Sequence, residues 1–110
     1  MILCGTDFSP AAREAARVAA ALALASNEPL HLLHVLPEDA GQEDRVAAQA
    51  ELSREVADLQ RLGAVVSSAM ARGFADELLR EAAAQEGVRG VVVSSRGRRG
   101  LERLGLGSVA

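Results

Sequence analysis

The sequence contains no lysine, tryptophan or tyrosine, and it has a single cysteine in 110 residues. Its two aromatic side chains, Phe8 and Phe74, cannot form the row of stacking rings that binders of single-stranded nucleic acid use. All 12 basic residues are arginines and the net charge is −3, which argues against nucleic acid as the main partner. A lone Cys4 excludes an internal disulfide, and its place in an apolar segment predicts a small core residue.

Long apolar runs are also absent. No stretch approaches the roughly 18 residues of a membrane span, and Asp7 interrupts the N-terminus too early for a signal peptide. We therefore expect a cytoplasmic protein that does not bind membranes. With 49% hydrophobic and 25% charged residues, a chain of this length is expected to form one globular domain.

Short apolar segments alternate with segments of helical periodicity. Strands are predicted at residues 1–7, 30–36, 64–70 and 90–93. The first predicted helix begins at Pro10, after the N-cap Ser9, and ends at Asn27. Its many alanines imply a close approach to the sheet.

Two more helices are predicted, at residues 43–62 and 74–86. The second helix is expected to bury an apolar side composed of Val46, Ala50, Leu52, Val56 and Leu59. Polar serines in the strand at 64–70 favour a place at the sheet edge.

This alternation predicts an α/β fold, in which an open parallel sheet carries helices on both faces. Ligands bind such sheets at the carboxyl ends of the strands, where the strand order reverses. Asp7, Val35 and residues 94–97 all lie at such carboxyl ends. If the first and fourth strands are neighbours in the sheet, Asp7 and the loop at 94–97 would face one crevice.

A glycine-containing segment follows the last strand. It reads Ser94-Ser95-Arg96-Gly97, then nine residues, then Gly107-Ser108-Val109-Ala110. Spaced glycines let backbone N–H groups converge on an anion, and a serine can cap a helix whose N-terminus favours negative charge. The pattern is typical of a phosphate-holding loop, and an ordinary strand-to-helix turn is the alternative. Four arginines in this segment either suit an anion or form a solvated charge run.

Taken together, ILCGTDFS (residues 2–9), LLHV (32–35), VVVSSRG (91–97) and Gly107-Ser108 resemble the universal stress protein family, and the resemblance covers essentially the whole chain. It implies a Rossmann-like, HUP-type fold with strand order 3-2-1-4. It also implies a regulatory or stress-response domain that binds an adenine nucleotide, with ATP as the first candidate. Whether Mg or Mn accompanies the nucleotide stays open.

The resemblance also assigns the ligand residues. Asp7 and the main chain of Gly5 and Thr6 would line the adenine end of the site, and Val35 would pack on the base. The ribose and phosphates would be held by Gly97, Gly107, Ser108 and Val109. From the residues alone, Asp7 equally fits a side-chain turn that leads into the first helix, and Val35 fits plain core packing.

Two departures from the family pattern stand out. Ser94 replaces the glycine that begins the loop in nucleotide-binding members, so its side chain either crowds a phosphate or donates to it. The sequence stops at Ala110, before the last helix and the fifth strand through which many members dimerise. We expect residues 1–110 to be a single, C-terminally incomplete domain of this family that forms a homodimer through its C-terminal region.

Alternatives from other functional classes stay open. The same fold without nucleotide binding would act as a dimeric protein-interaction module. An enzyme has less support: there is no Walker lysine and no nucleophile beside a base, so at most slow ATP hydrolysis is expected. A dehydrogenase would carry Gly-x-Gly-x-x-Gly after the first strand, where this chain has Gly5-Thr6-Asp7-Phe8-Ser9. His31 and His34 lack partners at metal-ligand spacing and are expected to be hydrogen-bonded structural residues.

Overall fold

The structure, a computed structural model, describes residues 1–94. Within them the strands are β1 (Ile2–Gly5), β2 (Leu30–Leu36), β3 (Val66–Arg72) and β4 (Gly90–Val92). The helices are α1 (Pro10–Ser26), α2 (Gln42–Arg61) and α3 (Ala75–Ala83). Four of the predicted ligand residues lie outside the described part: Gly97, Gly107, Ser108 and Val109.

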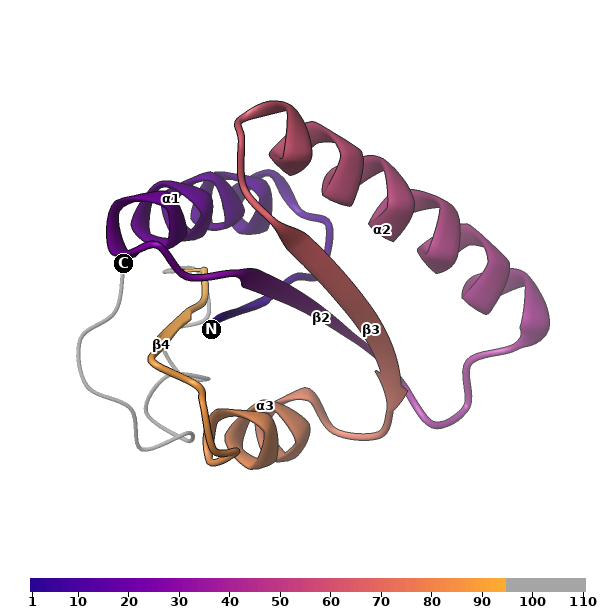
Figure 1. Cartoon of the computed structure of the whole chain (residues 1–110). Coiled ribbons are helices and arrows are strands. Elements are labelled where there is room, and N and C mark those ends of the chain that lie inside the picture. The colour runs from indigo at the N-terminus through magenta and orange to yellow at the C-terminus, as the bar shows by residue number, and fades with distance from the viewer. Residues whose placement is uncertain (95–110) are drawn as a thin grey trace.

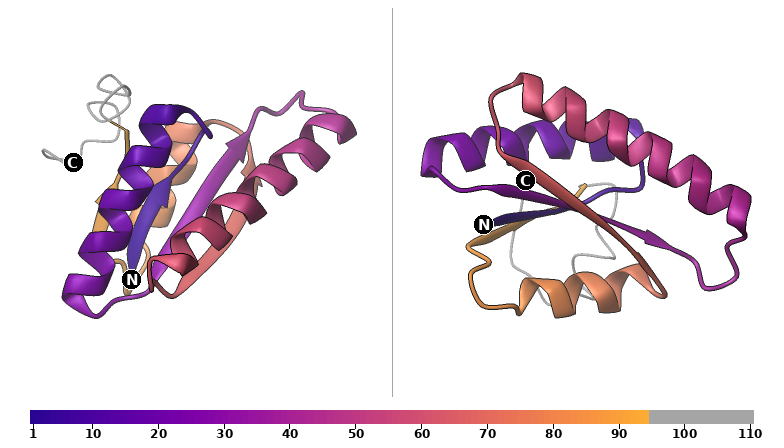
Figure 2. Two further views of the ribbon diagram at one scale, coloured as in Figure 1. Left: turned by 90° about the horizontal axis from the view of Figure 1, so that it is seen from above. Right: turned by 45° about the vertical axis from the view of Figure 1, so that its right-hand side comes forward.

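The strands form one parallel sheet in the order β3-β2-β1-β4, which confirms the predicted open sheet and its strand order. α1 and α2 cover one face of this sheet and α3 covers the other (Figures 1 and 2). Because side chains alternate along a strand, Ile2 and Cys4 face α1 and α2, whereas Leu3 and Gly5 face α3.

The core lies mainly between the sheet and α1. Four alanines of this helix have no exposed surface: Ala16, Ala19, Ala20 and Ala23. They pack in one cluster with Cys4, Leu32 and Leu52, which come from β1, β2 and α2. Alanine side chains keep the helix backbone close to the sheet, so the alanine-rich sequence of α1 specifies this tight layer.

Local signals fix both ends of α1. Ser9 Oγ accepts a hydrogen bond from the Ala12 N–H at 3.1 Å, and Pro10 occupies the first turn. At the other end, Asn27 adopts the left-handed conformation (φ 56°) and its N–H bonds the last helical carbonyls. The predicted start and end of this helix are confirmed.

The predicted apolar side of α2 is partly wrong. Val46 is 60% exposed and Ala50 is also exposed, whereas the buried residues of this helix are Ala48, Leu52, Glu55 and Leu59. The sequence interpretation chose the most apolar residues, but packing against α1, β2 and β3 selects a different stripe. That stripe includes one carboxylate.

Other boundaries differ by small amounts. β1 ends at Gly5, the last residue that pairs with β2, so Thr6 and Asp7 lie in a loop. α3 is shorter than predicted and has no fully buried residue. Among the described strands β3 pairs only with β2, which confirms the predicted edge position. No helix within residues 1–94 is long and apolar enough to cross a lipid bilayer.

Candidate functional site

The strand order reverses between β1 and β4, and of the predicted ligand residues Gly5, Thr6, Asp7 and Ser94 lie at or just after the ends of these two strands. Cys4 lies opposite Val92 in the sheet, and Thr6 and Ser94 each follow two residues further along the chain. Asp7 follows Thr6 and is exposed, and Ser94 is half-buried. Parallel sheets bind ligands in the crevice outside such a reversal. The structure therefore brings the ends of β1 and β4 together, as the sequence predicts.

Val35 lies on β2, the other neighbour of β1. Its side chain is half-buried, and by strand alternation it faces the α3 side of the sheet, opposite to its neighbour His34. Gly5 faces this same side, and a Cβ atom placed there would lie 3.0 Å from two methyl carbons of Leu79. The absence of a side chain at Gly5 thus lets α3 approach the end of β1 closely.

Thr6 connects the loop after β1 to two other elements. Its Oγ1 donates toward both carboxylate oxygens of Glu55, at 3.2 and 3.3 Å, and accepts a hydrogen bond from the Phe8 N–H at 3.2 Å. Its carbonyl oxygen lies 2.8 Å from Nδ1 of His34. Because a carbonyl can only accept, Nδ1 carries the proton in this contact. Thr6 is buried and fixed by its own side chain and carbonyl.

Phe8 completes the packing of this loop. Its ring stacks on the imidazole of His34, with the ring centroids 4.2 Å apart and the planes at 29°. Phe8 also adopts a positive φ of 66°, a conformation that few non-glycine residues take. His34 therefore supports the loop through its Nδ1 and its ring face, which confirms the structural interpretation of this histidine. His31 similarly contacts Ser67 Oγ at 2.7 Å.

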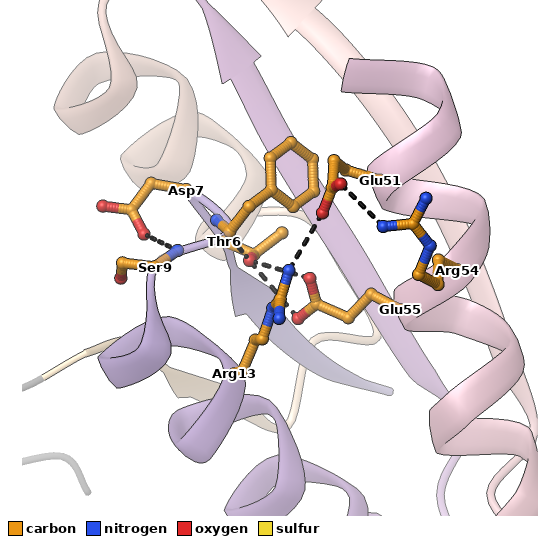
Figure 3. A network of polar contacts seen from close by, with 8 residues as sticks. Thr6, Asp7, Ser9, Arg13, Glu51, Arg54 and Glu55 are labelled. Carbon is orange, nitrogen blue, oxygen red and sulfur yellow. Dashed lines mark hydrogen bonds and ion pairs between the residues drawn. The ribbon is translucent and has the colours of Figure 1, made fainter. Parts of the chain in front are cut away.

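Asp7 begins the turn into α1. Its Oδ1 accepts a hydrogen bond from the Ser9 N–H at 3.0 Å, which is the side-chain turn that the sequence suggested as an alternative (Figure 3). The carboxylate stays exposed, so this turn does not remove it from solvent. The turn holds the Asp7 carboxylate in a fixed direction just after the end of β1.

Glu55 is the one charged side chain in the buried stripe of α2, and only 6% of its surface is exposed. Burial raises the pKa of this carboxyl above its usual range, while the Thr6 hydrogen bond and the nearby Arg13 oppose the rise. Figure 3 shows Glu55 pointing from α2 toward Thr6, beneath the loop that carries Asp7. The sequence interpretation missed this residue.

A chain of surface ion pairs borders Glu55. Arg13 on α1 bonds Glu51 at 2.9 Å, and Arg54 bonds the same carboxylate at 2.8 Å. These side chains are between a third and two thirds exposed, so the pairs contribute little stability. The hollow between α1 and α2 that these residues line has a volume of about 40 Å³. This volume has room for a few water molecules and is far too small for a nucleotide.

The spacing of the buried residues of α2 could have identified Glu55 from the sequence. Ala48, Leu52, Glu55 and Leu59 recur at spacings of four, three and four residues, which is one helical stripe. A carboxylate inside such a stripe implies a buried polar partner. Within residues 1–94 no group of three or more His, Cys, Asp or Glu side chains is arranged to hold a metal ion.

The whole chain, residues 1–110, matches the model of the universal stress protein family. Among solved structures it is similar to a universal stress protein from Archaeoglobus fulgidus, with a TM-score of 0.84 and 20% identity, covering 98% of this chain and 90% of that chain. The A. fulgidus protein in complex with dAMP gives a TM-score of 0.83 at 21% identity, covering 94% and 86%.

A further similar structure is a universal stress protein in complex with cAMP, with a TM-score of 0.71 and 22% identity, covering 89% of this chain and 82% of that chain. At these identities the similarity shows the shared fold. No curated protein matches the chain in sequence.

Proposed function

The chain belongs to the universal stress protein family, and we propose that it binds an adenine nucleotide, with ATP as the first candidate, as a regulatory or stress-response ligand. The observation that carries the proposal is the convergence of Asp7, Val35 and Ser94 at the carboxyl ends of three neighbouring strands. The two similar proteins described as complexes with dAMP and cAMP support an adenine nucleotide as the ligand class.

Each of these residues suits one part of such a ligand. The exposed Asp7 carboxylate accepts hydrogen bonds from N–H or O–H groups, and it is held by the Ser9 N–H. Half-buried Val35 offers apolar surface to the base. We further propose, from the sequence, that Gly97, Gly107, Ser108 and Val109 hold the ribose and phosphates.

Ser94 favours a second candidate function. A side chain stands where nucleotide-binding members have glycine, and it is half-buried beside the end of β1. If this hydroxyl crowds the phosphates, the domain would act without nucleotide, as a dimeric protein-interaction module.

Titration calorimetry with ATP, dAMP and cAMP tests the proposal on the parent, Gly97→Val, Ser94→Gly and the control Gly41→Val. A branched side chain at position 97 would block the close backbone approach that a phosphate requires, so Gly97→Val is expected to lose at least about tenfold in affinity. Gly41 precedes α2 and has a φ of −86°, and a Cβ atom there would meet only Asp44 Oδ2 at an ordinary contact distance of 3.9 Å, so Gly41→Val should bind like the parent.

The results separate the two candidate functions. Tighter binding by Ser94→Gly would show that Ser94 weakens the site, and unchanged binding would show that it is tolerated. Gly97→Val binding as well as the parent would exclude this loop as the phosphate site. A parent that binds none of the three nucleotides overturns the proposal, and light scattering would then test the dimeric module.

A further inference from the structure

The burial of the Glu55 carboxylate in the packed stripe of α2 costs free energy. Its neighbours in the buried stripe of α2 are Leu52 and Leu59, so a leucine at this position would continue the apolar surface. Removing a carboxylate from water is unfavourable unless a partner compensates it. The hydrogen bond that compensates the buried Glu55 carboxylate comes from Thr6, which is 49 positions away in the sequence, and not from another residue of the core.

The Thr6–Glu55 contact determines the orientation of the Thr6 hydroxyl. The single hydroxyl proton points to the carboxylate, which leaves a lone pair of Oγ1 for the Phe8 N–H. The Phe8 amide lies beyond the end of β1 and has this side-chain oxygen as its acceptor. Without Glu55 the hydroxyl proton of Thr6 would have no fixed acceptor, so the lone pair that accepts the Phe8 N–H would no longer be held in one direction.

Charged groups face Glu55 from each neighbouring element. Arg13 approaches from α1, but its ion pair is with Glu51 at 2.9 Å. Asp58 lies one turn further along α2, and Asp7 lies in the loop after β1. Both are carboxylates and repel the charge of Glu55, so the bond from Thr6 is the directed contact in this group.

We propose that Glu55 is a positioning residue for the nucleotide site, and this inference rests on the proposed function. By accepting the Thr6 hydroxyl, Glu55 holds the loop of residues 6–9 in the conformation that presents Asp7 to the ligand. Helix α2 thereby controls the ligand site without touching the ligand. Glu55 lies on the α1–α2 face of the sheet, whereas Gly5 and Val35, which line the proposed site, face α3.

Four variants test this proposal by ATP affinity and by urea unfolding. Glu55→Leu removes the acceptor but suits the apolar stripe, and Thr6→Val removes the donor at nearly the same volume. Each is expected to lower ATP affinity about tenfold, the effect of one lost hydrogen bond, while Glu55→Leu unfolds at the same or a higher urea concentration. Glu55→Gln keeps an acceptor and should restore affinity to within about threefold. The control Glu51→Gln breaks the Arg13 ion pair and should bind like the parent.

A double variant, Glu55→Leu with Thr6→Val, checks that both residues act through the same bond. Its loss of affinity should equal that of Thr6→Val alone and not the product of the two, because Glu55→Leu acts only through the Thr6 hydroxyl. Losses that multiply would overturn the proposal, and so would parent-like affinity of Glu55→Leu. A loss of affinity that follows a lower unfolding midpoint would also overturn it, because Glu55 would then be merely structural.

Amide hydrogen exchange separates this proposal from the proposed function, because it needs no ligand. The Phe8 amide is expected to exchange about tenfold faster in Glu55→Leu and Thr6→Val than in the parent. The amides of β2 should exchange at the same rates as in the parent. Unchanged Phe8 exchange in Glu55→Leu would overturn the positioning of the loop by Glu55, whatever nucleotide binding shows, because Thr6→Val removes the acceptor of the Phe8 amide directly. A parent that binds no nucleotide overturns the proposed function, and Phe8 exchange then decides by itself whether Glu55 orders the loop.

Discussion

The two faces of the sheet are packed differently. On the α1–α2 face, α1 alone buries six alanines, and Leu52 and Leu59 of α2 are almost fully enclosed. On the α3 face, the inward residues of α3, among them Leu78 and Leu79, are only half-buried within the described part of the chain. Within residues 1–94 the helices of the first face are therefore the more closely packed, and the second face carries Gly5 and Val35 beside the proposed ligand site.

This division has a physical advantage for a binding protein. A ligand site needs accessible polar groups and some freedom to adjust, whereas a core needs close packing without voids. The Thr6–Glu55 hydrogen bond joins the two regions, because Glu55 belongs to the packed face and Thr6 to the loop that carries Asp7. Substitutions on the two faces should accordingly have separable effects.

A matched pair of leucines gives the largest expected difference between the faces. Leu52→Ala removes a side chain that is 1% exposed and is expected to lower the free energy of unfolding by about 2–5 kcal/mol. Leu79→Ala removes the same atoms from a half-buried site on α3 and should cost about 1 kcal/mol, because less apolar area is lost. Urea unfolding of both variants measures this. Equal losses would show that the two faces contribute alike.

Gly5 sharpens the comparison on the α3 side. A Cβ atom at this position would lie 3.0 Å from two methyl groups of Leu79, so Gly5→Val is expected to lower the free energy of unfolding by about 1–3 kcal/mol. Combining it with Leu79→Ala should recover part of that loss, since the clashing methyl groups are gone. The two losses adding in full would contradict a direct contact between β1 and α3.

The sequence predicts the strands and helices well where local signals agree. The second strand, residues 30–36, and α1 from Pro10 to Ser26 match the structure, because Asn27, Pro29 and Pro37 interrupt the chain at their ends. The order of the strands follows from the family resemblance and is also confirmed. The side-chain turn of Asp7 was open as an alternative and is present.

Long-range polar contacts could not be predicted in this way. The partners of Thr6 are Glu55 and His34, which are separated from it by 49 and 28 residues, and no local pattern links them. The interpretation of α2 favours Val46 and Ala50 because they are more apolar than Glu55, but the packing of α2 against α1, β2 and β3 buries the stripe that contains Glu55. What the sequence missed is therefore the connection between the packed face and the site.

The pH dependence of stability gives the smallest expected effect. It reports on the Glu55 carboxyl, which lies on the α1–α2 face of the sheet. Burial raises the pKa of Glu55 above its ordinary value of 4.5, so the folded protein binds a proton more readily here than the unfolded chain does. The free energy of unfolding of the parent, relative to Glu55→Gln, should therefore rise as the pH falls from 7 toward 4.5 and stay constant below.

The control is built into that comparison, because glutamine does not titrate and the other acidic groups are common to both proteins. Urea unfolding at a series of pH values, with parent and variant side by side, measures the difference. A difference that falls as the pH is lowered would mean that the fold stabilises the ionised carboxylate.

The most direct test of the central claim, that an adenine nucleotide binds at the carboxyl ends of β1, β2 and β4, is a titration of ¹⁵N-labelled protein with ATP followed by amide chemical shifts. The account predicts that the shifts of Asp7, Phe8, Val35 and Ser94 change together and saturate with one affinity, while amides along α2 and at the β3 edge move little. Spectra that stay unchanged at millimolar ATP, or changes centred on the α1–α2 hollow, would contradict it.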